Sequence, residues 1–590
     1  MKILLSLLSL LISTCLFAQT PTETYPLDPA SEEQPGVPKG ELLKFTFDAS
    51  QVFPGTTREI SVYVPAQYKG DQAACVYVNQ DGIQWKAPTV LNNLIHKKEI
   101  PVTIGIFVTP GKVVARNKDT EMDRFNRSFE YDGVNGNYAR FLLDEIFPFV
   151  ESQKTADGRS IRLSKNGNDR AIGGSSSGAV CAFTAAWERP EEFSKVFSAI
   201  GTYTGLRGAD HYAILVRKYE PKPIRIFLQD GSNDLNIYAG DWWKANEAME
   251  RALTFAGYDV NHVWGEGAHS GAHGTAVFPA AMRWLWRDYP KPVEPSPTKN
   301  QFLSDILIPG EGWQLVGEGY GFTEGTAVNA KGEVFFHDIP NAKTYKVSGE
   351  GKPELYNPDS KKASGAAFTT AGEMVTITGG WSEPPTKQVH RYKTPTRYEV
   401  VADETPGNDI TVSYKNNIYV TSPDGREKPS KIYLIKPNGE RIVVDEGLKF
   451  ANGLCLSPDQ TQLYVTESAS HWVWVFQVQA DGTLKHKQKY GWLHVRDADD
   501  NAWSDGIKCD REGRIYVTTL SGIQVMDQLG RVNAIIPTPK TKGQVSNLCF
   551  GGSNFDIMYV SVHDKVFRRK VRVKGVNGFE SPVRPPQPRM

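Results

Sequence analysis

Residues 170–187 read RAIGGSSSGAVCAFTAAW, and this stretch decides how the first half of the chain folds. Arg170–Gly173 is a short apolar strand candidate, and the residues from Gly178 onward repeat apolar side chains at helical spacing. Between them, Gly174–Gly178 fits GxSxG, the pattern of a serine held on a tight strand-to-helix turn. The pattern alone is weak, but a strand before it and a helix after it are the context that it requires. We therefore predict that Ser176 is a nucleophile.

An acid and a histidine should follow such a serine, in that order. The strand candidate at 224–228 leads into Asp230 and Asp234, and the next one leads into His269 and His273. We predict Asp234 as the acid, with Asp230 as the alternative. We predict His269 as the base because it ends its strand directly, with His273 as the alternative. The competing interpretation is an ordinary turn serine and a surface histidine.

The surrounding sequence alternates strand-like and helix-like segments. Short apolar strands each precede a segment with 3.6-residue periodicity, which predicts a mostly parallel sheet with helices on both faces. The N–H of Ser177, at the start of the helix after the nucleophile, is available to stabilise an oxyanion. The expected strands are Ala74–Val78, Val102–Val108, Arg170–Gly173, Ile224–Leu228 and Val260–Trp264, and the expected helices are Tyr138–Phe149, Gly178–Trp187, Trp242–Phe255 and Ala276–Trp286.

Four further motifs, with the Ser176 turn, carry a resemblance to a known family. They are Gln80-Asp81-Gly82, Arg127–Asp132, Phe147–Val150 and Gly267-Ala268-His269. Over residues 40–290 the chain resembles the branch of the α/β-hydrolases that holds enterochelin esterases and carbohydrate (feruloyl and acetyl-xylan) esterases. The resemblance implies an α/β-hydrolase fold, a serine esterase without a cofactor, and a second oxyanion donor on the backbone near Gly82. Ala268 departs from the Gly-Gly-His that many relatives carry.

The second half of the chain has a different pattern. Helical periodicity disappears after residue 300, and a short apolar strand motif recurs six times, mostly after turn-forming residues. The centres of neighbouring repeats lie 40 to 52 positions apart, which is the period of a β-propeller. We therefore predict an all-β, six-bladed propeller, with a β-sandwich as the alternative. The repeats are Val334–Phe336, Met374–Thr376, Ile418–Val420, Leu463–Val465, Ile515–Val517 and Met558–Val560.

Four polar residues occupy the same position in four of these repeats. Glu324, Asn408 and Asp505 lie 11 residues before the centre of their repeat, and Asn452 lies 12 before. Because the innermost strands of all blades line one channel, these side chains should converge. Two carboxylates and two amides without Cys or His form a hard-oxygen site, which suits Ca²⁺, Mg²⁺ or Mn²⁺. The alternative is that they are ordinary turn residues.

Residues 304–575 resemble the SMP-30/gluconolactonase/regucalcin lactonases through these same motifs. The resemblance implies that Glu324, Asn452 and Asp505 ligate a divalent metal, most simply Ca²⁺, with Mn²⁺, Mg²⁺ or Zn²⁺ as alternatives. It also implies that Asn408 binds substrate and that Asp505 doubles as a base. Thr421–Pro423 and Gly379–Trp381 depart from the family pattern, so a non-catalytic binding module is an alternative for this half.

The N-terminal sequence indicates export. Lys2, an apolar run and Ala18 form the pattern of a signal peptide over residues 1–18. A lipoprotein anchored at Cys15 is the alternative, which Thr14 disfavours.

The remaining five cysteines have apolar neighbours and no ligand spacing, so they predict buried thiols. We expect a leader at 19–40, an esterase domain at 41–290, a linker at 291–303, a propeller at 304–575 and a tail at 576–590, of which residues 580–590 should hang free.

Charge and length limit the remaining function classes. The chain has 590 residues with 67 Lys+Arg and 67 Asp+Glu, which gives no electrostatic basis for binding nucleic acid. No other apolar run reaches the ~20 residues of a membrane span. We expect a periplasmic or secreted bifunctional hydrolase that acts on a carbohydrate ester, acyl or uronoyl, and on a sugar lactone. A siderophore esterase is one alternative, and an esterase with a propeller that only binds is the other.

Overall fold

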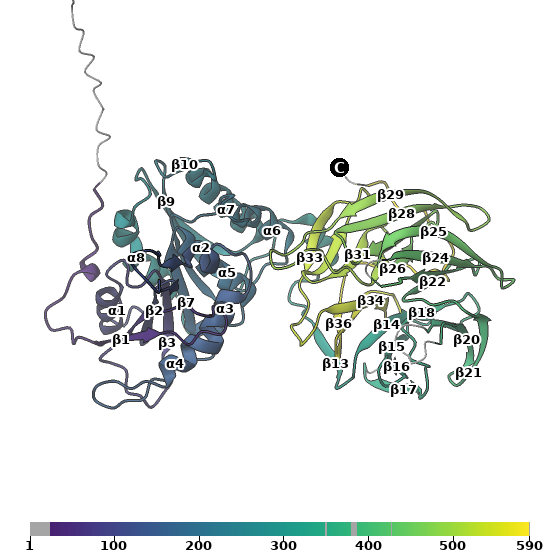
Figure 1. Cartoon of the computed structure of the whole chain (residues 1–590), viewed down its shortest axis with the longest axis horizontal. Coiled ribbons are helices and arrows are strands. Elements are labelled where there is room, and N and C mark those ends of the chain that lie inside the picture. Colours follow the sequence, from purple (N-terminus) through teal and green to yellow (C-terminus); the bar gives the residue numbers. More distant parts are fainter. Residues whose placement is uncertain (1–23, 349–350, 379–385, 426–427, 589–590) are drawn as a thin grey trace, which may run out of the picture.

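The structure is a computed structural model that describes residues 24–348, 351–378, 386–425 and 428–588. The chain forms two bodies that lie side by side, a layered α/β part and a β-propeller (Figure 1). The predicted signal peptide at 1–18, the first residues of the leader and the Gly379–Trp381 departure lie outside the described residues.

The α/β part is built on one eight-stranded sheet with the order β1-β2-β4-β3-β7-β8-β9-β12. β2 is antiparallel to both of its neighbours, β1 and β4. The six strands β4, β3, β7, β8, β9 and β12 run parallel to one another. The predicted parallel strands are therefore confirmed, and β1, β2 and β8 are additions. The strands are β1 (Glu41–Phe47), β2 (Arg58–Val64), β3 (Cys75–Gln80), β4 (Thr103–Val108), β7 (Arg170–Ser175), β8 (Lys195–Ala199), β9 (Arg225–Gly231) and β12 (Asp259–Gly265).

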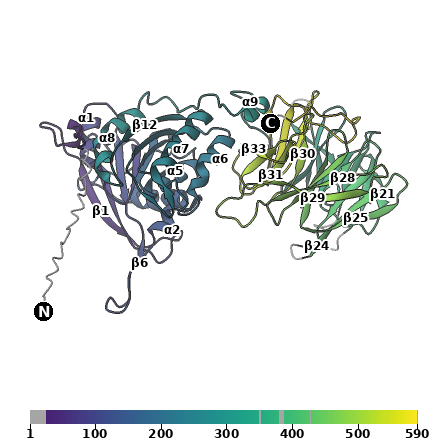
Figure 2. The same ribbon diagram turned by 90° about the horizontal axis from the view of Figure 1, so that it is seen from above.

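Helices cover both faces of this sheet (Figure 2). α1 and α8 pack on one face, and α3 to α7 pack on the other. The single helix expected at 138–149 is instead α3, a π turn at Leu142–Ile146, and α4, because Pro148 lacks the N–H that a continuous helix needs. The helices are α1 (Ala87–His96), α2 (Arg127–Tyr131), α3 (Asn137–Phe141), α4 (Phe147–Glu151), α5 (Ser177–Glu188), α6 (Tyr212–Lys218), α7 (Trp242–Ala256), α8 (Gly271–Leu285) and α9 (Gln301–Ile306).

The second body is a six-bladed propeller, as the repeats predict. Each blade is a four-stranded antiparallel sheet, and each of the six sequence repeats is the second strand of its blade. β13 (Gln314–Glu318) pairs with β36 (Lys565–Lys570), so the last blade joins the two ends of the domain. The first five blades are β14–β17 (Thr323–Asn357), β18–β21 (Gly365–Ala402), β22–β25 (Ile410–Lys449), β26–β29 (Ala451–Trp492) and β30–β33 (Ile507–Ile536), and β34 (Val545–Gly551) and β35 (Ile557–Val562) complete the sixth.

The expectation of a free tail is wrong for the described residues up to 588. The Val583 N–H donates to the Pro458 carbonyl, and Gln528 Nε2 donates to the Pro586 carbonyl. A proline-rich segment has few donors of its own, but its carbonyls remain acceptors for side chains of the blades.

The cysteine and membrane predictions can also be compared with the structure. All five cysteines within the described residues are buried and unbridged, as predicted. No helix in the described ranges is both long enough and apolar enough to cross a membrane.

Candidate functional sites

Ser176 lies on a strained turn at the carboxyl edge of the sheet, between β7 and α5. Its backbone has φ of 59° and ψ of −122°, a region that side-chain-bearing residues rarely adopt. Gly174 is required by space, since a Cβ at this position would lie 2.2 Å from the Gly178 carbonyl oxygen. The turn therefore holds the serine hydroxyl at the end of the sheet, as the GxSxG pattern predicts.

The structure brings Ser176, His269 and Asp234 together. His269 Nε2 lies 2.9 Å from Ser176 Oγ, and His269 Nδ1 lies 2.5 Å from Asp234 Oδ1. The Asp234 side chain is fully buried, whereas His269 is about one-fifth exposed. An imidazole that donates through Nδ1 to a carboxylate has its Nε2 lone pair free to accept the serine proton. The geometry is therefore that of a nucleophile, a base and an orienting acid.

The alternative acid, Asp230, neighbours Asp234 and makes no hydrogen bond or ion pair with His269 in the described residues. Burial raises the pKa of Asp234, but the hydrogen bonds from His269 and Asp230 outweigh it and leave that pKa below its usual value. Burial and the neighbouring Asp234 raise the pKa of Asp230 well above its usual range. Both Oδ2 atoms are buried without another donor, so a proton kept on Asp230 satisfies the pair.

The alternative base, His273, belongs to the packing of α8. It is buried, its Nδ1 lies 3.0 Å from Gln229 Nε2, and its ring stacks on Tyr25 at 4.0 Å. The leader residue Tyr25 therefore supports the helix that follows the base loop, and His273 is not in reach of Ser176 in the described structure.

Thr202 and Trp242 join the site without any signal in the sequence analysis. Thr202 Oγ1 lies 3.1 Å from Ser176 Oγ and accepts a hydrogen bond from Trp242 Nε1, also at 3.1 Å. Because Ser176 donates to His269, the Thr202 proton is directed at the serine oxygen. Trp242 also packs edge-on against His269, with ring centroids 6.0 Å apart. These two residues fix the serine rotamer and one side of the base.

The two predicted oxyanion donors have different environments. The Ser177 N–H begins α5 and has no acceptor among the described residues. The Gly82 N–H donates to the Val108 carbonyl at 3.1 Å, so the prediction of Gly82 as a donor does not fit this structure. The Asp81 N–H likewise bonds the Tyr131 hydroxyl. Sequence alone could not show that a backbone carbonyl and a side-chain hydroxyl accept from these two amides.

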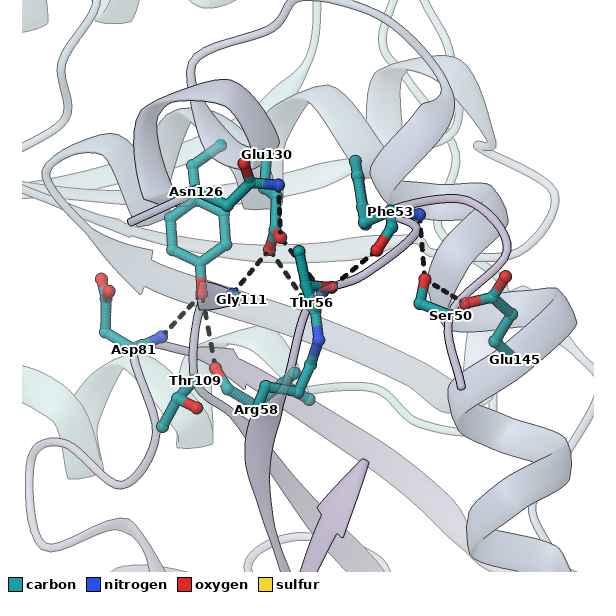
Figure 3. A network of polar contacts seen from close by, with 12 residues as sticks. Ser50, Phe53, Thr56, Arg58, Asp81, Thr109, Gly111, Asn126, Glu130 and Glu145 are labelled. Atoms are coloured by element: carbon teal, nitrogen blue, oxygen red, sulfur yellow. Dashed lines mark hydrogen bonds and ion pairs between the residues drawn. The ribbon is translucent and has the colours of Figure 1, made fainter. Parts of the chain in front are cut away.

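A buried ion pair between Arg58 of β2 and Glu130 of α2 anchors α2 to the sheet (Figure 3). Glu130 accepts two hydrogen bonds from Arg58, at 2.7 and 3.0 Å, and others from Asn126 Nδ2 and the Gly111 N–H. Both charged side chains are fully buried, so loss of one partner would cost roughly 3–5 kcal/mol. This anchor sets the start of α2, where Arg127 pairs with Asp81 at the end of β3.

In the propeller, all four predicted polar residues line one cavity of about 190 Å³. They come from four different blades, which explains how residues up to 181 positions apart meet. Aromatic, small and amide side chains complete the wall. The lining residues are Phe322, Glu324, Ser364, Asn408, Phe450, Asn452, Ser468, Ala469, Asn501, Trp503, Asp505 and Gln544.

This cavity concentrates negative charge. Burial, and then the charge of Asp409, raise the pKa of Glu324 to about 8. Burial and the charges of Glu324 and Asp409 raise the pKa of Asp505 well above its usual range. Lys508 offsets part of this repulsion. Asp409, next to the predicted Asn408, is buried, and its carboxylate was missed because it reads as part of a turn.

The chemistry of the donors fits a hard divalent cation. Asn452 donates through Nδ2 to Ser468 Oγ at 3.0 Å, and its Oδ1 is buried without a hydrogen-bond partner. An unsatisfied amide oxygen beside two crowded carboxylates is the donor set that Ca²⁺ or Mg²⁺ accepts. Within the described residues, no three His, Cys, Asp or Glu side chains gather as a metal site, since this set has only two carboxylates and an amide.

The structure therefore has two separate candidate sites, one at the edge of an α/β sheet and one in a propeller channel. Residues 50–286 match the family described as "Putative esterase", and residues 322–564 match "SMP-30/Gluconolactonase/LRE-like region". These two matches cover separate parts of the chain, one esterase-like and one gluconolactonase-like, and both indicate a hydrolase.

Curated relatives match the second region. The gluconolactonase of Zymomonas mobilis is 27% identical over 184 residues, which is 28% of this chain and 51% of the relative. The diisopropyl-fluorophosphatase of Loligo vulgaris is 24% identical over 125 residues, 19% of this chain and 39% of the relative. The chain thus spans about half or less of the length of these relatives.

Solved structures also match part of the chain. An enterobactin esterase of Shigella flexneri has a TM-score of 0.34 and 18% identity, and the match covers 44% of this chain and 63% of that one.

Proposed function

We propose that the chain is an exported bifunctional hydrolase, with a serine carboxylesterase on an α/β-hydrolase fold and a metal-dependent lactonase in the propeller. One observation carries the first half of the proposal: Ser176 Oγ, His269 Nε2 and Nδ1, and Asp234 Oδ1 form a continuous hydrogen-bonded chain. The proposed substrates are an acyl or uronoyl ester of a carbohydrate and an aldono- or uronolactone.

The esterase reaction follows from this chain of hydrogen bonds. His269 takes the Ser176 proton as the serine oxygen attacks the ester carbonyl, and Asp234 stabilises the imidazolium that forms. The Ser177 N–H, at the start of α5, would donate to the oxyanion that develops. His269 then returns the proton to the leaving alcohol, and an attacking water repeats the cycle to release the acid.

The lactonase half rests on the cavity that Glu324, Asn452 and Asp505 line together. These three residues would hold a divalent cation, Ca²⁺ in our proposal, which would supply Lewis acidity toward a lactone carbonyl. Asn408, on the same wall, would orient the lactone through its amide. Asp505 would accept the proton of the attacking water, since it lies at the cavity and has no ion-pair partner in the described residues.

Covalent labelling tests the esterase proposal directly. A fluorophosphonate probe should modify the full-length wild-type chain at Ser176, and a tryptic digest would locate the adduct. Ser176→Ala should abolish labelling, and His269→Ala should slow it by at least a hundredfold because the base is gone. Labelling at another serine, or none in the folded wild type, would contradict the assignment.

Substrate class is tested by hydrolysis of aryl acetate, feruloylated xylan, glucuronoyl ester and gluconolactone. Calcium binding, measured by calorimetry on wild type and on Glu324→Gln, tests the metal site separately from turnover. If the wild type binds no divalent cation and hydrolyses no lactone, the propeller is a binding module that accompanies the esterase.

A further inference from the structure

The loop of residues 493–504, which we call the bridging loop, contacts both halves of the molecule. It connects β29 (Leu484–Trp492) to the innermost strand of the next blade, β30 (Ile507–Cys509). On one side, Asn501 and Trp503 line the cavity that also contains Asp505. On its other side, the loop faces the α/β domain. The bridging loop is therefore part of the wall of the proposed lactonase site.

Two side chains of the α/β domain bond this loop. Lys218 Nζ, at the end of α6, lies 2.9 Å from His494 Nε2, and Asn135 Nδ2 lies 3.3 Å from Asp497 Oδ2. Lysine can only donate, so His494 accepts through Nε2 and its proton is on Nδ1. Burial, and then the charge of Lys218, lower the pKa of His494 to about 4, so this acceptor is neutral at ordinary pH.

The propeller itself holds the middle of the bridging loop weakly. Its ends are fixed, since Gln524 bonds the His494 backbone twice and the Ala502 N–H donates to the Ser470 carbonyl. Between them, residues 495–501 make hydrogen bonds only within the loop and to Asn135, among the residues that the structure describes. The α/β domain therefore supplies the external polar contact to this stretch.

Apolar packing also connects the bridging loop to the α/β domain. Leu493 and Ala502 are buried in a cluster that also contains Tyr212 and Tyr219 of the α/β domain. The domains also join away from the loop, where Glu220 pairs with Arg569, and Lys540 bonds the Glu188 carbonyl and Glu191. The interface thus has one part that reaches the cavity wall and another part that does not.

We propose that the α/β domain positions the propeller site, through Lys218 and Asn135, which hold the bridging loop so that Asn501 and Trp503 close the cavity wall. The proposal rests on the proposed lactonase function for its kinetic consequences, but the holding of the loop can be measured without it. Lys218 and Asn135 are positioning residues, since the structure places neither at the cavity.

The test uses the full-length chain as wild type, as Lys218→Met with Asn135→Ala, and as Lys540→Met. The last variant is a matched control, because it removes an interdomain lysine that does not touch the bridging loop. Hydrogen exchange of peptides from 493–504 should be about tenfold faster in the double variant than in wild type, and unchanged in the control. The single variant Lys218→Arg should keep the slow exchange of wild type, since arginine keeps a donor at this position.

Kinetics with glucono-1,5-lactone and CaCl₂ give the second readout. We expect the double variant to raise KM about five- to tenfold with kcat within twofold, because Asn501 and Trp503 line the cavity and Asp505 lies beyond the loop. Hydrolysis of an aryl acetate should not change. Unchanged exchange, or equal effects in Lys540→Met, would overturn the proposal, as would faster exchange with unaltered lactone KM. If the wild type is inactive on lactone and binds no Ca²⁺, the proposed function fails, and the exchange experiment still decides whether the α/β domain holds the loop.

Discussion

The two sites differ in how their charges are balanced. In the α/β domain, the Asp234 carboxylate faces the His269 imidazole, and the proton on Asp230 keeps the second carboxyl neutral. In the propeller, Asp409 raises the pKa of Glu324, both of these residues raise the pKa of Asp505, and Lys508 compensates only part of their charge. The first site is complete with its own side chains, whereas the second has an excess of negative charge that a cation would neutralise.

This difference gives opposite expectations for mutations. Removing a member of a complete hydrogen-bonded set leaves its partners unsatisfied. Removing one of several crowded carboxylates relieves repulsion in the cation-free protein but weakens binding of the cation. Stability and function should therefore change in the same direction at the first site and in opposite directions at the second.

The largest effect is expected at the nucleophile. Ser176→Ala should lower kcat for an aryl acetate by roughly 10⁵-fold or more, because no acyl-enzyme can form. Ser232→Ala, at an exposed position on the same rim, is the control and should leave turnover unchanged. Residual hydrolysis within tenfold of wild type would show that another group carries the reaction.

The charge comparison is tested by Glu324→Gln. This variant should weaken Ca²⁺ binding by about 10- to 100-fold in calorimetry, because one anionic ligand is lost. In excess chelator, its melting temperature should be higher than that of wild type, because the folded protein no longer has to keep a buried carboxyl protonated next to Asp409. Lower melting temperature in chelator would contradict the interpretation of a site with excess charge.

The pH dependence of stability gives a third test. Burial and Asp409 raise the pKa of Glu324 from 4.5 to about 8, so the folded chain holds a proton there that the unfolded chain has released. Its contribution is fully present below pH 4.5 and is lost as the pH rises toward 8. Cation-free wild type should therefore lose melting temperature across this window relative to Glu324→Gln. Parallel curves for the two proteins would be evidence against the raised pKa.

The smallest effect is expected at Thr202. Thr202→Val keeps the shape but removes the hydroxyl that bonds Ser176 and accepts from Trp242. We expect kcat for ester hydrolysis to fall about tenfold with KM nearly constant, as for loss of one positioning hydrogen bond. Thr202→Ser should recover most of the rate. A change confined to KM would place Thr202 in substrate binding instead.

Much of this arrangement could be predicted from sequence because it depends on local patterns. The GxSxG turn between a strand and a helix located Ser176, and the 40- to 52-residue period fixed six blades. The same period placed Glu324, Asn408, Asn452 and Asp505 in one cavity, since equivalent positions of different blades share one axis.

The remaining features depend on contacts between distant segments. Thr202 and Trp242 meet Ser176 only through the sheet order, and no spacing in the sequence marks them. The Gly82 N–H could be excluded as a donor only once its bond to Val108 was known. Strand β8 was missed because it is only five residues long and includes a buried lysine, Lys195, which breaks the apolar pattern.

The most direct test of the account measures each activity without the serine nucleophile and without the metal. Ester and lactone hydrolysis would be measured on wild type and on Ser176→Ala, each with excess Ca²⁺ and with excess chelator. We predict that Ser176→Ala abolishes ester hydrolysis and spares lactone hydrolysis, whereas chelator abolishes lactone hydrolysis and spares ester hydrolysis. Loss of both activities in Ser176→Ala, or loss of ester hydrolysis in chelator, would contradict the assignment of two sites with separate chemistry.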